Sequence, residues 1–67
     1  MITLYSNHCV RCDILKQKLD SKNVSYNLVD KTEDLIEKGL ANEFFPILEV
    51  DGKLLNFGES NDYVNSL

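Results

Sequence analysis

Hydrophobic and polar residues alternate with different periods in successive parts of the chain. Residues 1–5 are apolar or β-branched throughout, which is typical of a strand covered on both faces. From Val10 to about Lys22, apolar residues recur at three- and four-residue intervals and predict an amphipathic helix, with Asn23 as a left-handed cap. The apolar positions of this helix are Val10, Cys12, Ile14, Leu15 and Leu19.

Two shorter elements are predicted next. In residues 24–30, Val24, Tyr26 and Leu28 alternate with polar residues, as in a half-covered strand. A short helix follows, capped by Asp30 or Thr32 and ending near Gly39. Its expected inner face consists of Leu35, Ile36 and Leu40.

The clearest local pattern lies in residues 46–57. Asp51-Gly52 separates two apolar runs and predicts a two-residue hairpin turn, because glycine tolerates a positive φ. Ser60 or Asn61 can then cap a last short helix. The residues expected to point inward from it are Tyr63, Val64 and Leu67.

The predicted order is strand, helix, strand, helix, strand, strand, helix. A strand–helix–strand unit followed by a hairpin implies an α/β fold with a four-stranded mixed sheet and three helices, its first two strands parallel. With 67 residues and no linker or repeat, residues 1–67 are expected to form a single domain.

Composition and charge narrow the function classes. The net charge is −4 and the seven basic residues are scattered, which argues against a nucleic-acid partner. No apolar segment approaches the roughly 20 residues of a membrane span, and residues 1–6 do not resemble a signal peptide. We therefore expect a cytoplasmic protein, where two cysteines are more often catalytic or metal-binding than a permanent disulfide.

Both cysteines and the single histidine fall within residues 7–12, NHCVRC. This cluster is compatible with a redox dithiol, part of a metal site or a structural disulfide. A tetrahedral zinc site needs four ligands, whereas His8, Cys9 and Cys12 supply three at most. No metal site is therefore expected within a single chain.

The spacing of the two cysteines favours the redox interpretation. At the start of the first helix, Cys9 faces unpaired backbone N–H groups that favour the thiolate, and Cys12 is expected on the buried face, close enough to form a disulfide. Cys9 would attack a substrate disulfide and Cys12 would resolve the mixed disulfide. The cation of Arg11, and His8 when protonated, would favour the Cys9 thiolate further.

The stretches YSNHCVRC (residues 5–12) and FFPILEVDGKLLNFGESND (residues 44–62) resemble the two halves of glutaredoxins and of the glutaredoxin-like electron donors to ribonucleotide reductase. The resemblance implies a thioredoxin-like fold (βαβαββα) and a dithiol–disulfide oxidoreductase that reduces protein disulfides or glutathione mixed disulfides. It also implies a cis Pro46 beside the dithiol, with the backbone of Phe45 pairing with the substrate. The substrate-binding residues expected around the dithiol are His8, Arg11, Phe45, Pro46, Gly58, Glu59 and Ser60.

The chain also departs from that family. Val10 and Arg11 stand between the cysteines where glutaredoxins commonly have Pro-Tyr, and Asn7 replaces a customary lysine. Glu59 replaces the second glycine of a Gly-Gly pair, and its charge should weaken binding of glutathione carboxylates.

The electron source is therefore left open between glutathione and thioredoxin reductase. We expect a monomer with no bound cofactor and a disulfide-containing protein as its substrate. Two alternatives stay open: a homodimer that binds an iron–sulfur cluster or another metal through Cys9, and a non-catalytic interaction protein with a thioredoxin fold.

Overall fold

The computed structural model describes residues 1–40 and 42–67, and within them four strands and three helices follow one another in the predicted order. The elements are β1 (Ile2–Tyr5), α1 (Val10–Ser21), β2 (Asn27–Val29), α2 (Thr32–Glu37), β3 (Ile47–Val50), β4 (Lys53–Leu55) and α3 (Phe57–Asn65). The predicted α/β class is confirmed.

The strands form one mixed sheet in the order β2-β1-β3-β4. β1 pairs with β2 in parallel, with Leu4 opposite Leu28. β3 runs antiparallel to both β1 and β4. The parallel pair and the hairpin predicted from the sequence are both confirmed.

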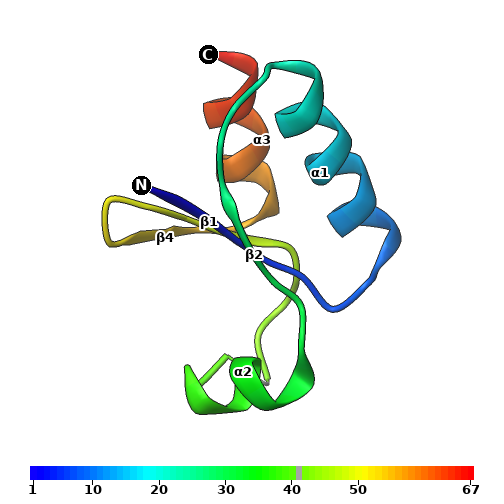
Figure 1. Cartoon of the computed structure of the whole chain (residues 1–67), viewed down its shortest axis with the longest axis vertical. Helices are drawn as coiled ribbons and strands as arrows, with labels where there is room; N and C mark the ends of the chain where they lie inside the picture. The colour runs from blue at the N-terminus through cyan, green and yellow to red at the C-terminus, as the bar shows by residue number, and fades with distance from the viewer. Residues whose placement is uncertain (41) are drawn as a thin grey trace.

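The helices cover the two faces of the sheet unequally. Figure 1 shows α1 and α3 side by side, whereas α2 lies apart at the opposite end of the molecule. The larger buried cluster belongs to the α1 and α3 side and consists of Leu4, Leu15, Leu19, Leu48, Leu55 and Val64. The smaller one lies under α2 and consists of Tyr5, Leu35, Leu40 and Ile47. Leu4 and Tyr5, successive residues of β1, thus enter different clusters, as expected for a strand covered on both faces.

Several apolar side chains predicted to be buried are exposed. Val10 and Ile14 of α1 face solvent, as do Ile36 of α2 and Leu67. α2 has only six residues, so Leu35 faces the core whereas Ile36, its neighbour on the helix, does not. Leu67 follows the end of α3, and its side chain is half exposed although its N–H donates to the Val64 carbonyl at 3.2 Å.

β2 is shorter than predicted, three residues instead of seven. It is an edge strand, and Leu28 is 42% exposed although its partner Leu4 is fully buried. Val24 and Tyr26 lie outside the strand but still pack against the larger cluster. The predicted alternation is therefore correct for these two residues and wrong for Leu28.

α3 begins at Phe57, several residues earlier than predicted. Asn56 is its N-cap: the Asn56 side chain accepts a hydrogen bond from the Glu59 N–H at 2.8 Å, and a Glu59 carboxylate oxygen accepts one from the Asn56 N–H at 3.2 Å. This reciprocal capping box satisfies two backbone donors at once. The prediction that Ser60 or Asn61 caps the helix is wrong, because both residues lie inside it.

The predicted cap of α2 is also wrong. Lys31 is the N-cap residue and makes no side-chain capping hydrogen bond, so neither Asp30 nor Thr32 has that role. The other turn predictions are confirmed. Asp51 and Gly52 both have positive φ angles, 50° and 87°, as does Asn23 after α1, at 56°.

Candidate active site

Cys9 occupies the N-cap position of α1. Its backbone is extended, with φ −85° and ψ 165°, and its sulfur accepts a hydrogen bond from the backbone N–H of Cys12 at 3.1 Å. The Cys9 sulfur therefore replaces the side-chain oxygen that usually caps a helix. A negative charge at this end of a 12-residue helix is favoured by the helix dipole, so the position favours a thiolate.

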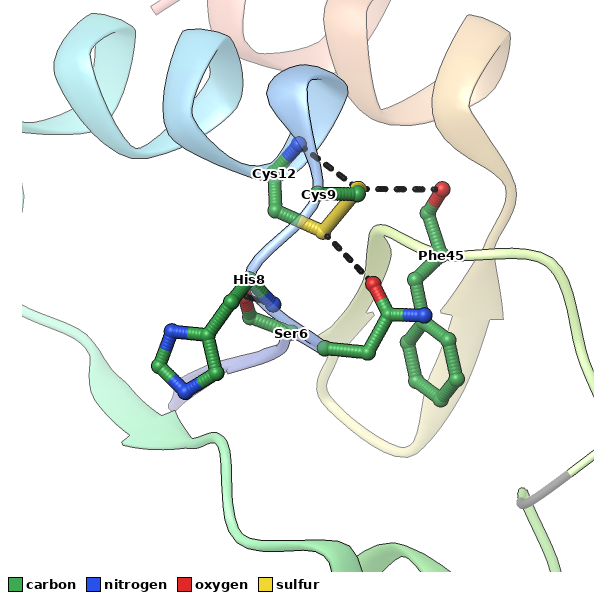
Figure 2. The surroundings of a disulfide bond; sticks show 6 residues. Ser6, His8, Cys9, Cys12 and Phe45 are labelled. Atoms are coloured by element: carbon green, nitrogen blue, oxygen red, sulfur yellow. Dashed lines mark hydrogen bonds between the residues drawn. A yellow bond between two sulfur atoms is a disulfide. The ribbon is translucent and has the colours of Figure 1, made fainter.

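Cys12 lies one turn into the same helix and is 1% exposed, whereas Cys9 is half-buried. The two sulfur atoms are at disulfide-bonding distance, and the Cα atoms are 5.0 Å apart (Figure 2). The predicted difference in burial between the two cysteines is confirmed. Cys9 is thus partly accessible from solvent, whereas Cys12 is enclosed by the protein.

The segment before Cys9 forms a tight turn that also contacts Cys12. His8 has a φ of 64°, and its backbone N–H donates to Ser6 Oγ at 3.1 Å. The Asn7 side-chain oxygen lies 3.6 Å from Cys12 Sγ, where it can accept a hydrogen bond from the thiol. Asn7, which the sequence marked only as the replacement of a customary lysine, is thus a neighbour of the dithiol.

The segment before β3 closes the other side of the site. The Phe45–Pro46 peptide bond is cis, as the family resemblance implied, and Pro46 is buried. The Phe45 carbonyl oxygen lies 3.7 Å from Cys9 Sγ (Figure 2). Residues 36 positions apart in the chain therefore meet at the accessible sulfur.

His8 and Arg11 make contacts away from the dithiol. Figure 2 shows the His8 imidazole pointing away from the two sulfur atoms, and its Nε2 lies 3.5 Å from an Asp30 carboxylate oxygen. The Arg11 guanidinium lies over the Phe57 ring, 5.6 Å from its centre, and so connects the first turns of α1 and α3. The described contact of the Arg11 guanidinium is therefore with Phe57 of α3.

The three remaining predicted site residues all lie in the first turns of α3. Gly58 and Glu59 are exposed, and the Glu59 carboxylate completes the capping box. Ser60 is fully buried, and its hydroxyl donates to the Leu55 carbonyl at 3.2 Å. Ser60 therefore supports the junction between β4 and α3 and presents no surface to a ligand.

Tyr5 anchors the end of β1, directly before the turn of residues 6–8. Its hydroxyl donates to a Glu49 carboxylate oxygen at 3.2 Å. Burial raises the pKa of Tyr5 above 10, and the charge of Glu49 and the hydrogen bond to it act in the same direction. The raised pKa favours the neutral phenol, and the hydrogen bond connects β1 to β3 directly before the turn that leads to Cys9.

The chain was compared with protein-family models, curated proteins and solved structures, and none of them matches. Residues 1–40 and 42–67 contain no group of three or more His, Cys, Asp or Glu side chains placed to hold a metal ion. No helix in this part of the chain has the length and hydrophobicity needed to cross a membrane.

Proposed function

We propose that this protein is a dithiol–disulfide oxidoreductase with a glutaredoxin-like, thioredoxin-type fold. One observation carries the proposal: a half-buried Cys9 at the N-terminus of α1 accepts the Cys12 N–H, with the buried Cys12 sulfur at bonding distance behind it. This arrangement gives the two sulfurs different access and different charge stabilisation, which a two-step exchange requires.

The reaction proceeds through a mixed disulfide. The Cys9 thiolate attacks one sulfur of the substrate disulfide, a Cys9–substrate disulfide forms, and the other substrate sulfur leaves as a thiolate that takes up a proton. Cys12 loses its proton and attacks Cys9 Sγ, which releases the second substrate thiol and leaves the Cys9–Cys12 disulfide. Two electrons pass to the substrate, and a thiol reductant returns them to the protein.

The substrate is a protein disulfide or a glutathione mixed disulfide. The Phe45 carbonyl lies 3.7 Å from Cys9 Sγ, and this proximity supports a role for the Phe45 backbone in pairing with the substrate cysteine. Glutathione or thioredoxin reductase supplies the electrons, in the cytoplasm, and ribonucleotide reductase is one candidate acceptor. The exposed Glu59 carboxylate favours a reductant other than glutathione, because both are anionic.

Two cysteine variants test the proposal. Cys9→Ser should abolish the reduction of a mixed disulfide, whereas Cys12→Ser should accumulate a covalent complex with the substrate, detectable by intact-protein mass spectrometry. The double variant is the matched control and should form no complex. Faster alkylation of Cys12 than of Cys9 would show that the assigned roles are reversed.

The same proteins separate the alternatives. Visible absorbance of protein purified without oxygen, lost in Cys9→Ser, would contradict the proposal in favour of a metal- or cluster-binding homodimer. Failure of both thiols to reduce any disulfide would leave an interaction protein with an idle dithiol. Comparing glutathione with thioredoxin reductase as reductants of the oxidised protein identifies the electron source.

A further inference from the structure

An apolar groove lies between the segment that leads into β3 and the start of α3. Its volume is about 270 Å³, and the side chains that define it include Leu40, Phe44, Ile47 and Leu54. Phe44 is 94% exposed and Leu54 49% exposed, so two large apolar side chains meet solvent around one depression. Large apolar side chains exposed around one depression are suited to contact another molecule.

The size and charge of the groove limit what can occupy it. A volume of about 270 Å³ is slightly below the roughly 300–1,000 Å³ of small-molecule pockets, and it suits one or two side chains. Glu43 and Glu59 are the charged residues that line it, and neither Lys nor Arg does so in the described part of the chain. The complementary ligand therefore has a large apolar side chain next to a cationic one.

The groove is also within reach of the dithiol. Phe44 and Ile47 lie one and two residues from Phe45, whose carbonyl is 3.7 Å from Cys9 Sγ. An extended peptide advances about 3.3 Å per residue, so a substrate whose cysteine meets Cys9 can place a side chain about two to four residues away in the groove.

We infer that the groove binds the segment flanking the reactive cysteine of a protein disulfide substrate. A large apolar side chain of that segment packs on Phe44 and Leu54, and an adjacent Lys or Arg faces Glu43 and Glu59. The inference rests on the proposed function, since it concerns the substrate of the same dithiol.

Four peptide disulfides test the inference. In each peptide, the same cysteine forms a mixed disulfide with a small thiol. The peptides differ in the pair of residues placed two to four positions from that cysteine on both sides, which is Leu-Lys, Leu-Glu, Ser-Lys or Ser-Glu. Single-turnover reduction by pre-reduced protein should be about tenfold faster for the Leu-Lys peptide than for the Ser-Glu peptide, about 1.4 kcal/mol. The preference for Lys should weaken as salt is added, because exposed charges are screened.

Matched variants assign the preference to the groove. Phe44→Ala should remove the preference for Leu over Ser, and Glu43→Lys should remove the preference for Lys over Glu, because the new cation offsets the charge of Glu59. Ile36→Ala and Glu37→Lys change an exposed apolar and an exposed acidic residue of α2 outside the groove lining, and both preferences should survive.

The outcomes separate the inference from the function on which it rests. Equal rates of reduction for all four peptides, together with reduction of a small disulfide, would contradict peptide binding in the groove but not the proposed oxidoreductase function. If no disulfide is reduced, the proposed function is wrong. Peptide binding in the groove is then tested separately by the affinities of the same four peptides with serine in place of cysteine: tighter binding of the Leu-Lys peptide supports it, and equal affinities contradict it. A concentration-dependent dimer that Phe44→Ala abolishes, without peptide preference, would assign the groove to a second copy of the chain and overturn the inference.

Discussion

Cys9 is the nucleophile of the proposed reaction and also the N-cap residue of α1. Its sulfur accepts the Cys12 N–H at 3.1 Å, a hydrogen bond that a serine hydroxyl can also accept. We expect Cys9→Ser to remove the nucleophile and keep the cap, whereas Cys9→Ala should lose both and cost about 1 kcal/mol of unfolding free energy. Urea unfolding of the two variants under reducing conditions measures the difference. Equal stabilities would contradict the capping role.

Asn7 is placed to influence the ionisation of Cys12. Its side-chain oxygen lies 3.6 Å from Cys12 Sγ, so Asn7→Asp would place a carboxylate beside the sulfur that loses a proton in the proposed reaction. Like charges disfavour that ionisation, and we expect resolution of the mixed disulfide to slow by about tenfold or more. Quenched-flow mass spectrometry of the mixed disulfide measures this step. The rate of Cys9 alkylation is the internal control, and an equal loss in both steps would contradict the assignment.

The sequence predicts the cysteine environments better than their polar neighbours. The positions of Cys9 at a strand–helix junction and of Cys12 on the apolar face follow from periodicity, and their unequal burial is confirmed. The contact of Asn7 depends on His8 adopting a φ of 64°, which no residue pattern indicates. The proximity of Phe45 to Cys9 is a tertiary contact between distant segments and lies beyond local patterns.

At the scale of the elements, the sequence contains a signal for the start of α3 that differs from the predicted cap at Ser60 or Asn61. Asn56 and Glu59 have the three-residue spacing of a capping box. The apolar residues Leu54, Leu55 and Phe57 extend the predicted strand over the cap, and Ser60 and Asn61 are competing cap residues. Local propensity alone does not determine which of these residues caps the helix. Tertiary packing determines it, because Ser60 is buried inside the fold and Asn56 is the N-cap.

The capping box makes a prediction about α3. Asn56→Ala removes the acceptor of the Glu59 N–H, and we expect a loss of about 1 kcal/mol in the free energy of unfolding. Asn65→Ala, at the exposed other end of the same helix, is the matched control and should change stability by less than about 0.5 kcal/mol. Urea denaturation of both variants provides the comparison. Similar losses would show that Asn56 acts through general helix propensity.

Tyr26 connects the chain before β2 to α1. Its hydroxyl donates to an Asp20 carboxylate oxygen at 2.9 Å, and burial, followed by this hydrogen bond, raises the pKa of Tyr26 to about 12. Since this folded-state pKa exceeds the unfolded value of 10, the neutral phenol contributes stability fully below pH 10 and loses it as the pH rises toward 12. In Tyr26→Phe, stability should depend less on pH in this range, as measured by urea unfolding at several pH values. An unchanged pH dependence would contradict the assignment.

The whole molecule rests on two clusters of unequal size on opposite faces of one sheet. α1 and α3 pack on the larger cluster, and these two helices carry the cysteines and the capping box. The smaller cluster lies under α2, and Phe45 packs against it. Apolar periodicity correctly predicted which elements exist. It did not predict how far α2 covers the sheet, because Leu35 and Ile36 are equally apolar and only the packed arrangement distinguishes them.

This division predicts two different responses to core substitutions. A domain of 67 residues has a total stability of about 3–10 kcal/mol, and Leu15→Ala, in the larger cluster, should cost about 2–5 kcal/mol and leave the protein close to unfolding. Leu35→Ala should fall at the lower end of that range, because its cluster is smaller and its side chain is 5% exposed. Leu28→Ala, at the exposed edge, should cost less than about 1 kcal/mol.

The functional consequence of Leu35→Ala follows from the position of Phe45. Phe45 packs against the smaller cluster, whereas Cys9 and Cys12 belong to the helix that covers the larger one. We therefore expect Leu35→Ala to preserve the rate of Cys9 alkylation while lowering kcat/KM for a peptide disulfide, since the segment proposed to contact the substrate loses its packing support. Parallel alkylation and reduction assays test this separation. A proportional loss in both would show that the two clusters form one cooperative unit and that α2 supports the thiols as directly as α1 does.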